Sequence, residues 1–580
     1  MKLQQKAVTL AGLLYIAMAV FHIPDQVFRH GFDKNAPAQF FALLVIGVVF
    51  SLFIVLKAHR FHFHRLAIYG AAALIGTQFL SLLMSGNFIA SLVGDVGRFV
   101  GVASTVALLL VSIFHTQFNF EGFMKLLRFY IVAVELVVLI GIAQRLNFVE
   151  LPGDQGIAST LGNSDFFAAF VGTAFPLLFL LALNSSRRIK IALGFLAVLN
   201  FWALYLAGPL QGYLDVAFAV VGILILAIRK YLPRRNLSLN ARTYIGTFAV
   251  IIWAEFIFLM PFIGHFVPVL GNDIQVKIRS NFWLAGMRQF FSHPFTGVGP
   301  DQYGNYYEQY RTLADIQQYT NIISNDAHSA SVQTLATTGI LGTAAFIFLI
   351  ALVIRSLLIL WDAGTINRKS LFAIGLYIFI YLTNSFVSPI TLTHKFLFWA
   401  VCGFIVGQVY RLPSRKSANS AKPRALAVSG AATLAVIAAL FAQGQLNFLS
   451  HIEKYAADNK QVSNYSSTAM IPCMMYFDAE LLMTNTRGAE AGINFAKDKA
   501  LQNPRCVSAL IAQLRAEVNS GRVNTLKPLV YKLHQIAPAR SETIALGMYY
   551  VNRTGDPYLA KILQHEMKVL GLAYVPGNLG

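Results

Sequence analysis

Long apolar runs alternate with short polar segments along most of the chain. A helix needs roughly 17 to 25 mainly apolar residues to cross the hydrocarbon core of a bilayer, and thirteen runs are close to that length. We therefore predict an all-α, multi-pass membrane protein whose transmembrane domain covers residues 1–446. The predicted spans are residues 7–24, 39–57, 66–84, 98–115, 126–144, 165–184, 190–207, 212–229, 244–262, 329–354, 371–388, 396–411 and 426–446.

Charge adds an orientation to this picture. Only 12% of the residues are charged and 56% are hydrophobic, whereas soluble domains carry about 25% charged residues. If the N-terminus is inside, the inner loops hold most of the Lys and Arg, as the positive-inside rule demands. Much of the net charge of +20 then reflects topology and not nucleic-acid binding. We expect the N-terminus inside and the C-terminus outside.

Residues 447–580 are expected to form a soluble, extracytoplasmic helical domain. Ala and Leu recur there at helical spacing, and Pro504 and Pro538 each precede a predicted helix, 34 residues apart. That spacing is typical of tetratricopeptide-like repeats; an ordinary helical domain is the alternative. Cys473 and Cys506 could pair if the domain lies outside, but three cysteines are too few for a disulfide framework or a metal cluster.

The longest polar interruption before that tail is a predicted outer loop at about residues 263–328, and it contains the candidate chemistry. His328 lies where the next apolar helix begins, so its imidazole is placed to accept a proton from a hydroxyl. Asp326 could orient that ring, but we favour a capping role through the backbone amides of residues 328 and 329. A purely structural histidine at a helix start is the alternative for His328.

Three arginines of the same loop are candidates for binding a diphosphate. Arg279, Arg288 and Arg311 carry the planar, permanently charged guanidinium that binds phosphate oxygens in a bidentate way. Arg279 and Arg288 are nine residues apart, so they face different sides if one continuous helix carries both. The alternative is an interfacial helix whose arginines meet anionic lipid headgroups.

Two other turns hold possible supporting residues. Asn163 lies in the turn before an apolar helix, where capping by Ser164 or Asp165 alone explains the pattern. Gln211 lies in a tight turn between two predicted spans. The sequence contains no evident metal-ligand set, no phosphate-binding loop of nucleotide enzymes and no serine-hydrolase turn. Glu135 and Glu255 are flagged as carboxylates within predicted spans.

Three motifs resemble those of the O-antigen ligase and polymerase superfamily, which includes O-linked protein oligosaccharyltransferases. Residues 161–170 (LGNSDFFAAF) resemble its Gly-Asn turn into a helix. Residues 293–300 (HPFTGVGP) resemble its His-Pro-x-x-Gly-x-Gly segment. Residues 326–329 (DAHS), followed by 338–342 (TGILG), resemble its histidine at a helix start that leads to Gly-Ile-x-Gly. The resemblance covers about residues 150–345.

The resemblance implies transfer of a glycan from undecaprenyl diphosphate to an acceptor hydroxyl on the outer face of the bacterial cytoplasmic (inner) membrane, without metal, nucleotide or other cofactor. His328 would match the family's histidine that activates the acceptor, and Arg279 and Arg288 its diphosphate-binding arginines. Attack by a single displacement would invert the anomeric centre. The partners would be the bilayer, a polyprenyl-diphosphate-linked glycan and a glycolipid, polysaccharide or protein acceptor; nucleic acid is not expected.

The chain departs from the family where many members carry an arginine and this sequence has Gln211; Arg98 or Arg311 could replace it. Ligation to a glycolipid, ligation to protein and polymerisation of repeat units share one chemistry, and the sequence leaves the choice open. A lipid-linked glycan transporter is the rival from another class, although we see no inverted repeat among the spans. A structural scaffold would leave the cations of the outer loop without a role.

Overall fold

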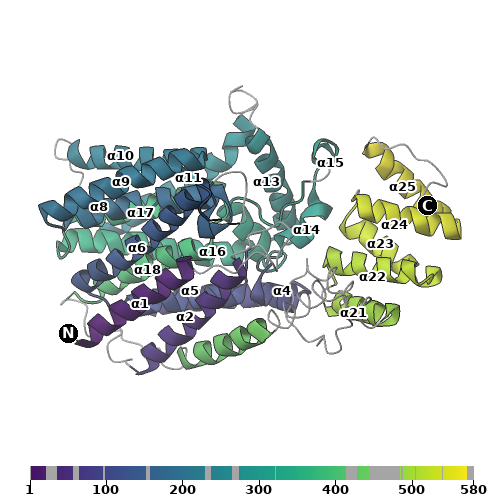
Figure 1. Cartoon of the computed structure of the whole chain (residues 1–580), viewed down its shortest axis with the longest axis horizontal. Coiled ribbons are helices and arrows are strands. Elements are labelled where there is room, and N and C mark those ends of the chain that lie inside the picture. The colour runs from purple at the N-terminus through teal and green to yellow at the C-terminus, as the bar shows by residue number, and fades with distance from the viewer. Residues whose placement is uncertain are drawn as a thin grey trace.

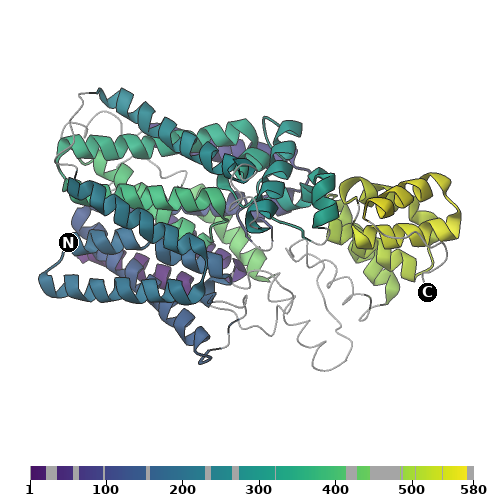
Figure 2. The ribbon, with the colours of Figure 1, turned by 90° about the horizontal axis from the view of Figure 1, so that it is seen from above.

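The computed structural model describes residues 2–20, 36–56, 65–95, 98–149, 151, 157–228, 237–263, 274–319, 322–412, 427–443, 484, 488–502, 504–538 and 540–570. Helices form nearly all of the regular structure within these residues, which contain no β-strand. The long helices lie side by side along the longest axis of the molecule, and the C-terminal helices lie beyond one end of this bundle (Figure 1; Figure 2).

Ten helices of the described residues are long and apolar enough to cross a membrane, so the chain is a multi-pass membrane protein. The other three predicted spans correspond to shorter apolar helices: α1 (Lys2–Val20), whose apolar part is Gln5–Val20, α5 (Val102–His115) and Ala427–Gln443. The count of thirteen is therefore not confirmed. The long spans are α2 (Ala36–Leu56), α3 (Arg65–Met84), α6 (Phe120–Arg145), the pair α7 (Ser164–Gly172) and α8 (Phe175–Leu183), α9 (Arg187–Ala207), α10 (Leu210–Ile228), α11 (Leu239–Ile263), α16 (Ala330–Ala363), α17 (Arg368–Val387) and α18 (Leu392–Val409).

The bundle is held by apolar packing in its centre. Phe50 of α2 stacks on Phe114 of α5 with ring centroids 3.8 Å apart, and α1 packs on α6, α2 on α5, and α5 on α18. Many large apolar side chains of α9, α10 and α11 are exposed, which is the distribution expected of helices that face lipid. Such a surface would be a liability on a soluble protein.

Carboxylates inside the spans differ in their surroundings. Glu135 is buried and accepts a hydrogen bond from Asn200, whereas Glu255 is exposed on α11. Asp215 of α10, which the sequence analysis did not flag, is buried and accepts a hydrogen bond from Asn384 at 2.8 Å. Each of these two buried carboxylates thus has one amide donor, whereas the second oxygen of Glu135 is buried without a partner among the described residues.

The predicted outer loop is itself helical. It contains α13 (Ile274–Ser292), α14 (Tyr303–Tyr310) and α15 (Leu313–Gln318). The short helix α4 (Phe88–Val93), from an earlier part of the chain, lies at the same end of the bundle (Figure 1). Because α13 is continuous, Arg279 and Arg288 lie on different faces of it, as the spacing predicts.

Two glycine-containing motifs interlock beside these helices. Helix α16 is kinked at Gly339, which has φ 64° and ψ −166°, a conformation that residues with a Cβ rarely adopt. The 293–300 segment packs into this kink: the amides of Val298 and Ile340 donate to the carbonyls of Ala336 and Pro294, at 2.9 and 2.8 Å. Carbonyls and amides freed by the kink are thereby paired.

The C-terminal helices are α21 (Ala489–Gln502), α22 (Val507–Asn519), α23 (Lys527–Ile536), α24 (Ser541–Thr554) and α25 (Pro557–Val569). They share their own hydrophobic core, and each packs on the next along the chain. Helices α22 and α24 begin 34 residues apart, but this does not establish a tetratricopeptide-like fold. Cys506 is disulfide-bonded and Cys402 is free; Cys473 lies outside the described residues.

Candidate active site

His328 lies in the turn immediately before α16. Its φ of 53° is left-handed, and its backbone N–H donates to the Asp326 carboxylate at 2.7 Å. Asp326 thus makes an Asx-type turn that holds the unusual backbone conformation. The carboxylate binds the backbone amide of residue 328 and not the ring, whereas the N-cap of α16 is Ser329.

The ring of His328 is oriented by a different atom. Its Nδ1 lies 3.0 Å from the backbone carbonyl of Asp326, which can only accept a hydrogen bond. Nδ1 therefore carries the proton and Nε2 carries the lone pair in the neutral ring. On one side the ring packs against Phe282 of α13, with centroids 5.1 Å apart.

The charge state of His328 follows from its surroundings. Burial lowers its pKa to about 4; Arg98 and Arg279 also lower it, and the carboxylate of Asp326 opposes them. The imidazole is therefore neutral at physiological pH and is able to accept a proton through Nε2. The same interactions place two arginine charges close to one proton acceptor.

Arg279 and Arg98 come from different elements of the chain. The guanidinium of Arg279 on α13 lies 3.9 Å from the carboxylate of Asp165. Arg98 lies in the loop between α4 and α5, with its guanidinium 4.9 Å from the ring centre of Phe166 at the start of α7. The helix that begins at Ser164 therefore touches both arginines, which links the Gly-Asn turn to the cationic site.

Asp301 fixes the loop that carries Arg98. Its carboxylate accepts the backbone amides of Asp95 at 2.7 Å and Val100 at 3.1 Å. Burial, with the nearby charges of Asp95 and Asp326, raises the pKa of Asp301 to about 8. Asp301 directly follows the 293–300 segment, so it connects the packing of that segment against the Gly339 kink to the position of Arg98.

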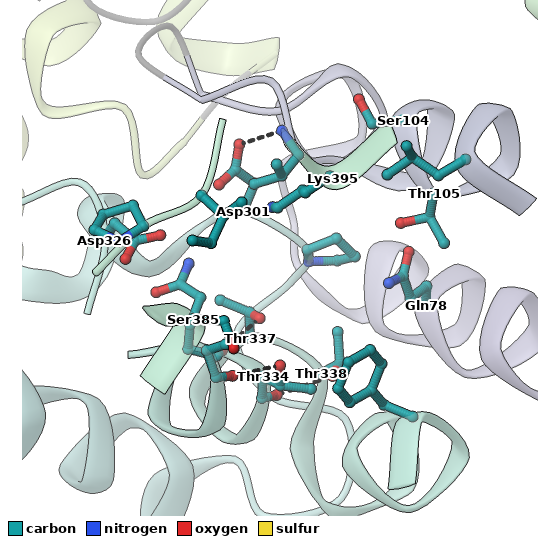
Figure 3. Close-up of a pocket in the computed structure, with 18 of the residues that line it drawn as sticks. Gln78, Ser104, Thr105, Asp301, Asp326, Thr334, Thr337, Thr338, Ser385 and Lys395 are labelled. Carbon is teal, nitrogen blue, oxygen red and sulfur yellow. Dashed lines mark hydrogen bonds between the residues drawn. The ribbon is translucent and has the colours of Figure 1, made fainter. Parts of the chain in front are cut away.

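A cavity of about 180 Å³ opens beside these residues. In Figure 3, Asp301, Asp326 and Lys395 lie on one side of it and threonine side chains of α16 on the other. Its wall combines charged, hydroxyl and amide groups with aromatic rings. The polar members are Gln78, Ser104, Thr105, Gln333, Thr334, Thr337, Thr338, Ser385 and Ser388, and the aromatic members are Phe346, Tyr381, Phe398 and Trp399.

The other two predicted arginines have different surroundings. Arg311 is buried; its Nε donates to Asp315 at 2.8 Å and its Nη2 to the carbonyl of Tyr319 at 2.6 Å. Arg288 is exposed on the other face of α13 and donates to the carbonyl of Arg311 at 3.3 Å. The Arg311 guanidinium therefore holds α15, and the Arg288 guanidinium ties α13 to the turn between α14 and α15.

Asn163 and Gln211 have local roles in the structure. Asn163, and not Ser164 or Asp165 as we expected, is the N-cap of α7, and its side chain accepts the amide of Asp165 at 2.7 Å. Gln211 donates to Asn384 at 2.6 Å, and Asn384 in turn donates to Asp215. Gln211 thus forms one end of a chain of side-chain hydrogen bonds that leads to Asp215.

The sequence analysis overlooked Lys395 and Asp301. Lys395 was placed just outside a span predicted at 396–411, but α18 begins at Leu392, so the lysine lies in its first turn and lines the cavity. A lysine next to an apolar run was the available signal. Among the described residues, no group of three or more His, Cys, Asp or Glu side chains is arranged to hold a metal ion, and metal independence stays a prediction.

A family model described as O-antigen ligase matches residues 167–347. Over these residues the chain matches the O-antigen ligase and polymerase superfamily, in agreement with the motifs in the sequence. The matched segment runs from α7 to the first half of α16 and includes Arg279, the 293–300 segment, His328 and Gly339. Members of this family are membrane enzymes of the glycosyltransferase type. Arg98, Lys395 and the C-terminal helices lie outside the match, and no curated protein matches the chain.

Proposed function

We propose that this protein transfers a glycan from undecaprenyl diphosphate to an acceptor hydroxyl at the outer face of the cytoplasmic membrane. The observation that carries the proposal is a neutral histidine whose Nε2 carries the lone pair and on which two arginine charges act. Asp326, two residues before this histidine, lines the polar and aromatic cavity. A base and a cationic site are what this reaction requires, because the leaving group already carries the phosphate charge.

In the proposed reaction, Nε2 of His328 takes the proton of the acceptor hydroxyl as its oxygen attacks the anomeric carbon. The bond from that carbon to the diphosphate oxygen breaks, and the diphosphate leaves with the electron pair. The carboxylate of Asp326 stabilises the imidazolium that forms, since it raises the pKa of the ring. One displacement of this kind inverts the anomeric centre.

We assign the diphosphate to Arg279 and Arg98. Both bear on His328 electrostatically, and the two guanidinium groups would bind the two phosphates in a charge-assisted way. Arg98 then takes the place of the arginine that Gln211 replaces. Arg288 and Arg311, which we also considered as diphosphate ligands, would act mainly by positioning α13 and α15, because their guanidinium groups bind backbone and Asp315.

The cavity suits a sugar ring. Hydroxyl and amide side chains can bind sugar hydroxyls, and aromatic faces pack against the apolar face of a pyranose. The family suggests a lipid-linked glycan and a polysaccharide acceptor in a membrane. Ligation to a glycolipid, ligation to protein and polymerisation of repeat units would all use this site.

A transfer assay in membranes tests the proposal and its rival. Undecaprenyl-diphosphate-linked glycan is supplied, and both the acceptor-linked product and the leaflet distribution of the donor are followed. We expect product from the wild type, and Arg279→Ala at equal expression to raise the KM for the donor. If the donor redistributes across the bilayer while no glycan reaches any acceptor, the protein is a transporter and the proposal is wrong.

A further inference from the structure

The C-terminal domain contains a groove that the proposed reaction does not use. Helices α21, α22 and α23 enclose a space of about 380 Å³. We call it the C-terminal groove and define it by Asn494, Lys497 and Leu501 of α21, Gln513 of α22, Arg522 of the following turn and Lys532 of α23. It lies beyond the end of the bundle, well away from the helices that face lipid (Figure 1).

Positive charge dominates the groove. Lys497 and Arg522 are exposed and Lys532 is half-buried. Glu517 is the one acidic residue in the lining, and its carboxylate is engaged by Gln513 at 2.9 Å and Thr525 at 2.6 Å. Arg522 pairs with Glu490, so the two lysines are the principal cations for a ligand. The charge of the groove is complementary to an acidic ligand.

The rest of the lining indicates which acidic ligand fits. Ile493, Leu510 and Leu529 contribute apolar surface, and Leu501 is 73% exposed at the rim. Asn494 and Gln513 offer amide groups that both donate and accept, as a peptide backbone requires. None of the lining residues is aromatic, unlike the membrane cavity, so the groove lacks the stacking surface of a sugar site.

The groove is connected to the candidate active site through α14. Helix α23 packs on α14. Arg505, whose charge bears on Lys532, donates to Gln309 at 2.8 Å and lies over the ring of Tyr306 at 4.0 Å. Next to Tyr306 on α14, Tyr307 packs against Phe282, the residue that contacts His328. Lys532 of the groove is therefore linked through Arg505 to the contact between the C-terminal domain and α14.

We propose that the C-terminal groove binds an extended acidic peptide segment with interspersed apolar side chains, supplied by a partner polypeptide. The lysines would pair with its carboxylates, the leucines would cover its apolar side chains, and the amides would bind its backbone. This goes beyond glycan transfer, because the groove could recruit either an acceptor or another protein of the cell envelope.

The test uses the full-length protein in nanodiscs and a fluorescent peptide, about twelve residues long, of alternating acidic and apolar residues. We expect saturable binding that weakens with salt. The double variant Lys497→Glu/Lys532→Glu should weaken binding by about tenfold or more, because each reversal turns attraction into repulsion. The matched control Lys561→Glu/Lys568→Glu makes the same charge change on α25, in the same domain, and should bind as the wild type does.

Two further measurements keep the outcome decisive. A photo-crosslinking residue at Leu501 should label the acidic peptide, whereas the same residue at the similarly exposed Tyr558 (66%) should not. A basic peptide of the same pattern should compete poorly. Equal binding by both double variants, equal labelling at both positions, or preferential binding of an anionic polysaccharide over the peptide would each overturn the proposal. Glycan transfer is measured on the same preparations, so that failure of peptide binding is distinguished from failure of the proposed transferase activity.

Discussion

Replacing Gly339 with alanine tests whether the two glycine motifs hold the site together. Gly339 has φ 64° and ψ −166°, a region that costs a residue with a Cβ about 1–3 kcal/mol. A Cβ there would also lie closer to the carbonyl carbon and oxygen of Phe295 than van der Waals contact allows, and 2.7 Å from the amide nitrogen of Thr296. These are backbone atoms, so no side-chain rotation relieves the clash.

The magnitude follows from what must move. If the 293–300 segment shifts away, the hydrogen bond from Ile340 N to the Pro294 carbonyl is lost, at about 0.5–1.5 kcal/mol. Together with the backbone strain, we expect a loss of roughly 2–4 kcal/mol. Because Asp301 directly follows the segment, Arg98 should also be misplaced and glycan transfer reduced.

Gly364 provides the matched control. It has nearly the same φ, 65°, at the end of the same helix, and an added Cβ would meet no other part of the described chain within 4 Å. Gly364→Ala should therefore show only the strain of a left-handed residue, about 1 kcal/mol, with activity unchanged. Thermal unfolding in detergent and donor turnover are measured for both. Equal stability and equal activity of the two variants would refute the claim that packing of the 293–300 segment against the Gly339 kink holds the site together.

Three further predictions concern charge. Arg98→Gln should raise the pKa of His328, which is about 4 in the wild type because burial and the arginines lower it. As the pH is lowered, the variant should therefore lose activity at a higher pH than the wild type does. An unchanged acid limb of the pH–rate profile would contradict the role of His328 as the base. The pKa of Asp301 is raised to about 8 from an ordinary 3.8, so between these pH values the folded state holds a proton that the unfolded state has lost, and stability should fall as pH rises from about 4 to about 8. Asp301→Asn should remove this pH dependence from melting curves recorded across that range. An identical slope in wild type and variant would count against the prediction. Arg540→Ala should loosen the C-terminal domain and expose it to limited proteolysis, because it leaves the nearly buried carboxylate of Glu308 without its 2.8 Å partner. Adding Glu308→Gln should restore much of the resistance to proteolysis. Failure of that rescue would argue against a stabilising role of the ion pair.

Much of the fold could be predicted from sequence because the bilayer imposes a simple length rule. The thirteen apolar runs all coincide with apolar helices, but three of these are shorter than a full span. The predicted span at 98–115 began too early, since α5 starts at Val102 and Arg98 lies in a loop. Hydropathy cannot distinguish a helix from the apolar residues that lead into it. The kink at Gly339 was also invisible, because it depends on contacts with the separate 293–300 segment.

The site was only partly accessible from sequence for a similar reason. His328 and Arg279 were singled out by motif and charge, and the structure brings them together. Arg311 was grouped with them on charge alone, although Asp315 stands four residues later on a helical spacing that favours an ion pair. Arg98 and Lys395 come from distant elements, the α4–α5 loop and α18, and only tertiary packing places them beside residues of the matched segment.

The most direct test of the central claim is turnover of purified protein with defined substrates. The wild type, His328→Ala and a control, His565→Ala on the exposed surface of α25, are supplied with undecaprenyl-diphosphate-linked glycan and acceptor, and released undecaprenyl diphosphate is measured. Our account predicts full activity in the control and a loss of about 10²–10⁴-fold in kcat for His328→Ala at unchanged stability. Transfer by His328→Ala at the wild-type rate would contradict it.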